Sequence, residues 1–272
     1  DLDGWYDLPS VVHREDRWII SRLDQVTVGV NESLRNFELG DAQQKLYDFF
    51  WNDYCDWYIE MAKLRIRSKE DPSPLPTLVH VLERTLRLLH PFMPFITEEI
   101  WQNLRSRVPL EGNSTESIMV AEYPDVENAR DDAQAEDEIG LVMEVIRAVR
   151  NIRAQLRIPA GQHLEAQFEA NGMQTVIEEE AEVIKVLSRV EPFHVVVGEA
   201  PANDLPKSVT LVVNPLVIHL QLEGVVDLSA EQERLRSELD ECVQNMVRVE
   251  KLVSNPNFLG KAKSEVVETE QA

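Results

Sequence analysis

The sequence is poor in the residues and motifs that build catalytic sites. Its 272 residues include only two cysteines, Cys55 and Cys242, which lie far apart and share no metal-ligand spacing with histidine. A disulfide framework or a zinc site is therefore not expected, and a cytoplasmic location fits best. The Gly-rich nucleotide loops and the HExxH and GxSxG motifs are also missing. We expect no catalytic residue, no metal and no cofactor in this chain.

Long hydrophobic runs and an excess of bases are missing too. No apolar run is long enough to cross a bilayer, and the first residues lack the basic and apolar regions of a signal peptide. The chain does not begin with methionine, which suggests a piece of something longer. Its 27 bases face 49 acids, for a formal net charge of −22. This balance argues against indiscriminate binding to membranes or nucleic acids, but a local basic surface stays possible.

The first 105 or so residues predict a helical bundle. Apolar residues recur at helical spacing over 15–34, and helices are also expected over 77–89 and 96–105. Asp41 is expected to cap the start of a long second helix. The buried stripe of that helix is expected to contain Leu46, Phe49, Phe50, Tyr54, Trp57, Met61 and Leu64.

The segment HPFMPF interrupts this helical pattern with two prolines. Proline inside a helix removes a hydrogen bond and clashes with the preceding turn. Pro91 and Pro94 are therefore expected to end one helix and start the next, forming a corner of the bundle. The side chains expected to turn into the core at this corner are Phe92, Met93, Phe95 and Ile96.

The second half of the chain changes its pattern twice. A long helix over 131–157 is followed by four short Val-rich strands, with a helix over 173–189 between the first two. A heptad then begins, with Leu228, Leu235, Cys242 and Val249 seven residues apart. We interpret it as one arm of a coiled-coil hairpin whose return helix is cut short; the alternative is a terminal helix packed on the body. The expected domains are 1–127, 128–227 and 228–272.

Two basic islands stand out against the acidic background. The first, beside Trp57 and Tyr58, ends the second helix with Lys63, Arg65, Arg67 and Lys69. The second consists of Arg147, Arg150, Arg153 and Arg157, most of them on one helix face. Guanidinium forks suit phosphate, and aromatic rings suit unpaired RNA bases. Complementing a helix C-terminus explains the first island equally well, and a solvated face is the commoner outcome for the second.

These segments resemble a known family. HPFMPFITEEIW and EDRWIISRLD resemble the anticodon-binding helical domain of the class I aminoacyl-tRNA synthetases for valine, isoleucine, leucine and methionine. WNDYCDWYIEMAK, IRAVRNIRAQLRIPAG and the C-terminal heptad segment resemble the valyl branch in particular. The resemblance runs from about Asp16 to Glu270 and departs at Lys263, where the family usually has proline. The family's HIGH and KMSKS motifs, which bind ATP, are absent from this sequence.

The resemblance implies a mainly α fold: an anticodon-binding bundle, a small α/β subdomain and the start of a coiled-coil hairpin. It implies recognition of the anticodon stem-loop of valine tRNA, within a monomeric parent enzyme that charges tRNA using ATP and magnesium. Three alternatives remain: the equivalent isoleucyl module, an acidic coiled-coil scaffold for proteins, and a free-standing enzyme with an unrecognised site. The tRNA contacts expected on this basis are Arg17, Arg22, Trp57, Tyr58, Lys63, Arg65, Arg67, Arg147, Arg150 and Arg153.

Overall fold

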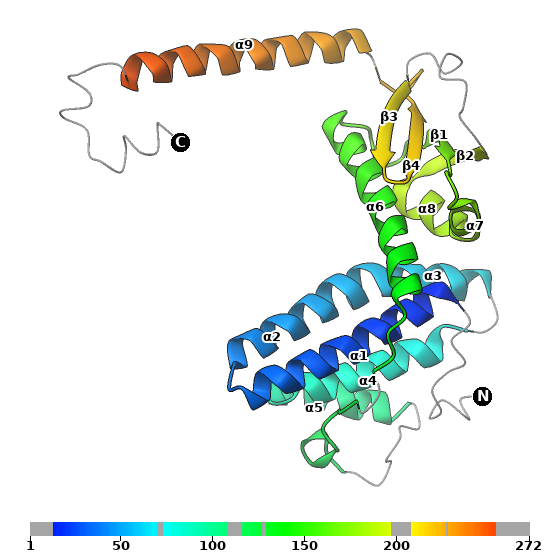
Figure 1. Cartoon of the computed structure of the whole chain (residues 1–272), viewed down its shortest axis with the longest axis vertical. Coiled ribbons are helices and arrows are strands. Elements are labelled where there is room, and N and C mark those ends of the chain that lie inside the picture. The colour runs from blue at the N-terminus through cyan, green and yellow to red at the C-terminus, as the bar shows by residue number, and fades with distance from the viewer. Residues whose placement is uncertain are drawn as a thin grey trace.

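The fold was analysed in a computed structural model, which describes residues 13–69, 73–107, 116–126, 129–196, 208–226 and 228–253. Figure 1 shows a helical bundle, a small α/β unit and one projecting helix. The bundle contains α1 (Arg14–Arg35), α2 (Leu39–Asp48), η1 (Phe49–Tyr58), α3 (Ile59–Ser68), α4 (Leu75–Leu89), α5 (Pro94–Arg105) and the short η2 (Ile118–Val120). The remaining elements are α6 (Ala133–Gln155), β1 (Leu164–Glu169), α7 (Gln174–Glu179), α8 (Ala181–Ser188), β2 (Val190–Val196), β3 (Ser208–Val213), β4 (Leu216–Gln221) and α9 (Leu228–Val253).

The second helix of the bundle is one long run made of α2, η1 and α3. Its expected apolar stripe faces the core, with Phe50 and Leu64 only partly buried. In η1 the hydrogen bonds reach five residues along the chain instead of four, a widening that the sequence pattern did not predict. The run begins at Leu39, so the expected cap at Asp41 is wrong. Asp41 lies in the first turn, where it accepts a hydrogen bond of 2.6 Å from the Ser33 hydroxyl.

The proline corner has the expected backbone but not the expected side-chain directions. Pro94 is the first residue of α5, as predicted. However, Met93, Phe95 and Ile96 are exposed, Phe95 to 90%, so their expected burial is wrong; only Phe92 is partly buried. The reason lies in the packing of α5, which turns Thr97 and Trp101 toward the bundle and thereby points its first turn outward.

The α/β unit is a four-stranded sheet with the order β2-β1-β4-β3. β1 pairs in parallel with β2 and antiparallel with β4, and β3 and β4 form a hairpin. Alternate residues of β1, such as Ala166 and Phe168, are buried, as expected for a strand with one covered face. The helix expected over 173–189 is in fact two helices, because α7 ends at Glu179 and α8 starts at Ala181.

α6 connects the two units (Figure 1). It packs on α1 of the bundle and on α8 and β3 of the α/β unit, so that a single apolar core runs through both. The Asp132 side chain caps its start by accepting a hydrogen bond of 3.0 Å from the Ala135 amide. The expected domain boundary at 127 falls among residues outside the described part of the chain.

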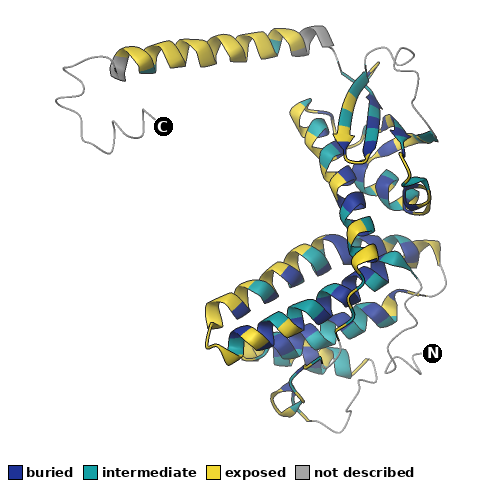
Figure 2. Ribbon diagram, in the orientation of Figure 1, coloured by how far each residue is buried: buried dark blue, intermediate teal, exposed yellow. Residues whose placement is uncertain are grey.

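α9 extends away from the α/β unit, and Figure 2 shows it exposed along most of its length. Its heptad positions Leu235, Leu239 and Met246 are all exposed, which contradicts the alternative of a terminal helix packed on the body. The expected return helix lies beyond residue 253, outside the described residues. None of the described helices is long and apolar enough to cross a membrane.

Candidate RNA-binding surface

The first basic island is mostly taken up by the fold. Arg65 is only 5% exposed, and one of its terminal nitrogens donates hydrogen bonds of 2.8 Å to Glu15 and to Asp16. Lys63 pairs with Glu60 one helical turn earlier, at 2.5 Å. Arg67 is exposed, and no carboxylate of the described residues lies within ion-pair distance of it. The expectation that Arg65 contacts RNA is therefore corrected: it is a buried partner of two α1 carboxylates.

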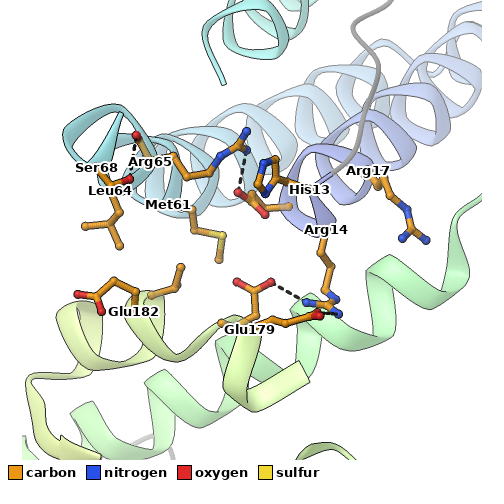
Figure 3. Close-up of a pocket in the computed structure, with 12 residues that line it drawn as sticks. His13, Arg14, Arg17, Met61, Leu64, Arg65, Ser68, Glu179 and Glu182 are labelled. Carbon is orange, nitrogen blue, oxygen red and sulfur yellow. Dashed lines mark hydrogen bonds and ion pairs between the residues drawn. The ribbon is translucent and has the colours of Figure 1, made fainter. Parts of the chain in front are cut away.

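Beside Arg65 lies a hollow of about 520 Å³ between the bundle and the α/β unit (Figure 3). We call it the joint hollow. Arg14 crosses it and donates to Glu179 and Glu180, at 2.8 Å each, and also to Glu138. Burial raises the pKa of Glu180 to about 7, despite the opposing effect of Arg14. Arg14 thus ties α1 to α6 and to the end of α7, and its guanidinium group is already occupied by carboxylates.

Tyr58 is also unavailable to RNA. Its side chain is fully buried, and its hydroxyl donates a hydrogen bond of 2.5 Å to Asp16. Burial raises the pKa of this hydroxyl above its usual range. The expectation that Tyr58 stacks on a base is therefore corrected. It is a core residue because the stripe that buries Tyr54 and Met61 also buries Tyr58.

The two arginines expected on the first helix are engaged in ion pairs across the bundle. Arg17 donates two hydrogen bonds to Asp132, of 2.7 and 2.8 Å, and holds the pKa of that carboxyl below its usual value. Arg22 pairs with Asp53 at 3.0 Å. Both side chains remain partly exposed. Their first role is to fix the start of α6 and the middle of η1 against α1.

The second basic island divides into exposed and buried members. Arg147 and Arg150 are exposed, and their guanidinium carbons lie 5.1 and 5.8 Å from the centre of the Trp57 ring. Trp57 itself is 6% exposed, so these arginines cover its ring and leave little of it for a base. Arg153 is buried and donates to the backbone carbonyls of Arg189, Pro159 and Gln162, which corrects its expected RNA contact.

A hollow of about 710 Å³ opens where Arg147 and Arg150 meet η1. We call it the corner hollow. On the bundle side it is lined by Asn52, Trp57 and three carboxylates, Asp53, Asp56 and Glu60. Because it combines amide, carboxylate and guanidinium groups, it can read the donors and acceptors of an unpaired base edge better than it can hold phosphate alone.

The sequence reasoning missed three exposed aromatic side chains. Tyr47 and Trp51 stand one helical turn apart, with ring centroids 6.3 Å apart and ring planes 7° from parallel. Trp51 is 52% exposed and directly precedes Asn52 of the corner hollow. Phe37, in the turn between α1 and α2, is 89% exposed and has a φ of 61°. For Tyr47 and Trp51 the available signal was their position off the apolar stripe of the second helix, since large rings in water commonly mark a binding surface.

Among the described residues, no cluster of three histidine, cysteine, aspartate or glutamate side chains could hold a metal ion. The built features are instead a stacked aromatic pair, a corner hollow of mixed polarity and exposed arginines. They lie on α2, η1 and α6, and the corner hollow also reaches Glu60 of α3 and Leu187 of α8.

The chain was compared with known proteins. The profile of the anticodon-binding domain of tRNA ligases matches residues 16–168, and the chain therefore belongs to this family. A second profile, the valyl tRNA synthetase tRNA binding arm, matches residues 227–272.

Individual relatives point to the same branch. The chain is 38% identical to the valine–tRNA ligases of Dehalococcoides mccartyi strain CBDB1 over 94% of its length, of Thermotoga maritima over 98% and of Oceanobacillus iheyensis over 100%. It spans 29%, 30% and 29% of these relatives, respectively, and matches their C-terminal part. Its sequence is thus similar to the end of a valine–tRNA ligase that follows the catalytic portion.

Proposed function

We propose that the chain is the anticodon-binding and arm-bearing part of a valine–tRNA ligase, and that its partner is the tRNA that accepts valine. The observation that carries this proposal is the exposed surface formed by the Tyr47–Trp51 pair and by Arg147 and Arg150 over Trp57. In a chain of net charge −22, this surface offers exposed aromatic rings on α2 and η1 and exposed guanidinium groups on α6. These are the groups that bind unpaired RNA.

Each part of the surface has a separate role in this proposal. The exposed ring of Trp51, held by stacking on Tyr47, supports a splayed anticodon base. The corner hollow reads base edges through Asn52 and Asp56, and Arg147 pairs with phosphate. α9 extends from the far end of the α/β unit toward the same side as α2 (Figure 1), so the arm can contact the tRNA body beyond the anticodon stem.

The parent enzyme's properties follow from the same proposal. Its reaction is the attachment of valine to tRNA, driven by ATP with magnesium in a catalytic portion that this sequence does not contain. We expect the parent to act as a monomer in the cytoplasm. The arm profile and the named relatives favour the valyl over the isoleucyl enzyme, and the exposed aromatic and basic groups favour RNA over a protein scaffold.

The proposal is tested by binding of the 272-residue chain to valine tRNA and to the same tRNA with a changed anticodon, over a salt series. We expect a preference for the native anticodon and an affinity that falls as salt rises. Trp51→Ala should weaken binding by about 1–3 kcal/mol, as stacking losses on single-stranded RNA do. Phe95→Ala is the matched control, since this exposed ring lies on α5 outside the surface. Equal losses in both variants, or equal binding of both tRNAs, would refute the assignment.

A further inference from the structure

A third hollow, of about 610 Å³, lies where α6 and α8 both end. We call it the arginine hollow. Four arginines line it, and none of the described residues that form its lining is acidic. This is unusual in a chain whose acids outnumber its bases by 49 to 27. The four arginines are Arg150, Arg153, Arg157 and Arg189.

The four guanidinium groups differ in how many hydrogen bonds and ion pairs they already make within the protein. Arg153 is buried and binds three carbonyls, so it builds the wall of the hollow. Arg150 uses its Nε to bind the Leu187 carbonyl at 2.8 Å, which leaves its two terminal nitrogens for another partner. The Arg157 side chain is 71% exposed, and its recorded contact is Glu238 of α9 at 3.8 Å. Arg189 is exposed, and no described carboxylate lies within ion-pair distance of it.

The backbone conformation makes two of these arginines suitable for replacement by glycine. Arg157 has a φ of 53° and Arg189 a φ of 57°, the left-handed conformation that follows the last turn of a helix. Glycine adopts this conformation without strain, whereas a residue with a Cβ resists it. Replacing either arginine by glycine should therefore remove the side chain without destabilising the fold.

We propose that the arginine hollow binds a backbone phosphate of the same tRNA, a claim that rests on the proposed function above. Guanidinium forks match the oxygens of a phosphate and donate two parallel hydrogen bonds to it. Arg150 belongs both to this hollow and to the corner hollow, so a strand that crosses Arg147 continues directly into it. Free polyphosphate shares the same chemistry, and the experiment must separate the two sources.

The test uses the full chain with Arg157→Gly and Arg189→Gly combined. These changes remove two guanidinium groups and relieve two strained backbones, so lost binding cannot be attributed to unfolding. We expect a melting temperature equal to or above that of the wild type. We also expect about tenfold weaker binding of tRNA at low salt and a salt dependence shallower by about two ions. The loss should be equal for native and changed anticodons, because phosphate carries no sequence information.

Lys69→Gly is the matched control. Lys69 is exposed, ends α3 and has a φ of 58°, but it does not line the arginine hollow. If the control loses as much tRNA affinity, the effect comes from the overall charge of the chain and not from this hollow, and the proposal is overturned. A double-glycine variant that keeps the wild-type tRNA affinity and salt dependence would also overturn the phosphate proposal. The proposed function would still hold in that case if the wild type prefers the native anticodon. A third outcome is that the wild type binds inorganic pyrophosphate and the variant does not, while both bind tRNA equally well. This result would refute RNA as the source of the phosphate.

Discussion

The molecule contains two groups of arginines with opposite surroundings. At the joint hollow, Arg14 and Arg65 are enclosed by carboxylates from α1, α6, α7 and the α7–α8 junction. Along α6, Arg147 and Arg150 are exposed over an aromatic ring. In the first group, Arg14 joins the bundle to the α/β unit and Arg65 joins α3 to α1 within the bundle. The second group remains available to a polyanion. In so acidic a chain, the position of the acids decides which bases can reach RNA.

The largest effect should follow from removing Arg65. Arg65→Ala would leave Glu15 and Asp16 buried without their cation, and breaking a buried pair from one side typically costs about 3–5 kcal/mol. Urea denaturation of the variant should show this loss in the free energy of unfolding. The affinity of the folded protein for tRNA should stay close to that of the wild type. If the variant has normal stability but binds RNA more weakly, Arg65 acts on RNA as the exposed group does, and the distinction between the two groups is wrong.

The next effect concerns Glu180, whose pKa is raised to about 7 by burial, from an ordinary value of 4.5. Because the folded protein holds this proton more tightly than the unfolded chain does, the contribution of Glu180 to stability falls as pH rises from about 4.5 through 7. Glu180→Gln cannot ionise and should lose this dependence. Thermal melts at pH 5 and pH 8 should show the variant gaining on the wild type by at most about 3 kcal/mol.

Glu182 offers a control for that measurement. It lines the same hollow but is more exposed, and it pairs loosely with Lys185 at 3.7 Å. Glu182→Gln should leave the pH profile almost unchanged. If it shifts the profile as much as Glu180→Gln does, general charge and not the buried carboxyl governs the pH dependence.

The sequence was sufficient to predict elements with a strong local pattern. The helices α1, α4 and α6 and the strands β1 and β3 agree with expectation to within two residues at their ends, because hydrophobic period and turn residues are local properties. The expected helix over 173–189 failed at Glu180, where tertiary contacts with Arg14 override the continuous pattern. The predicted burial of Met93, Phe95 and Ile96 at the proline corner was wrong, because the segment HPFMPF alone does not determine the direction in which α5 packs.

The candidate site was less predictable for a related reason. Arg65 reads as part of a basic island because the sequence shows only its near neighbours. Its carboxylate partners lie 49 and 50 residues away, and those of Arg14 lie 124 to 166 residues away. Arg147 and Arg150 have distant acids in the corner hollow beside them, but no described carboxylate lies within ion-pair distance, and both arginines kept their predicted exposure. Whether a basic residue stays exposed or becomes paired therefore depends on where distant acids lie in the fold. A single sequence does not show this.

A smaller effect is expected from the exposed group. Arg147→Ala should weaken tRNA binding by about 1 kcal/mol and reduce the salt dependence by about one ion. Its stability should fall by no more than about 1 kcal/mol, the usual value of an exposed cation–π contact. The comparison variant is Arg67→Ala, which removes an exposed arginine of the first island. Filter binding over a salt series should separate the two; an identical loss would place the first island on the RNA as well.

The smallest effect is expected at Lys63, where the first island is exposed but paired. The Lys63–Glu60 pair spans three residues on one helix surface, and such pairs contribute about 0.2–0.5 kcal/mol. Lys63→Ala should therefore change both unfolding and tRNA affinity only slightly, and Glu60→Gln should free the lysine. If Glu60→Gln strengthens tRNA binding and Lys63→Ala cancels that gain, the neighbouring acid is what keeps this island from RNA. If Glu60→Gln leaves the affinity unchanged, the end of α3 lies outside the path of the tRNA, and position rather than pairing distinguishes it from α6.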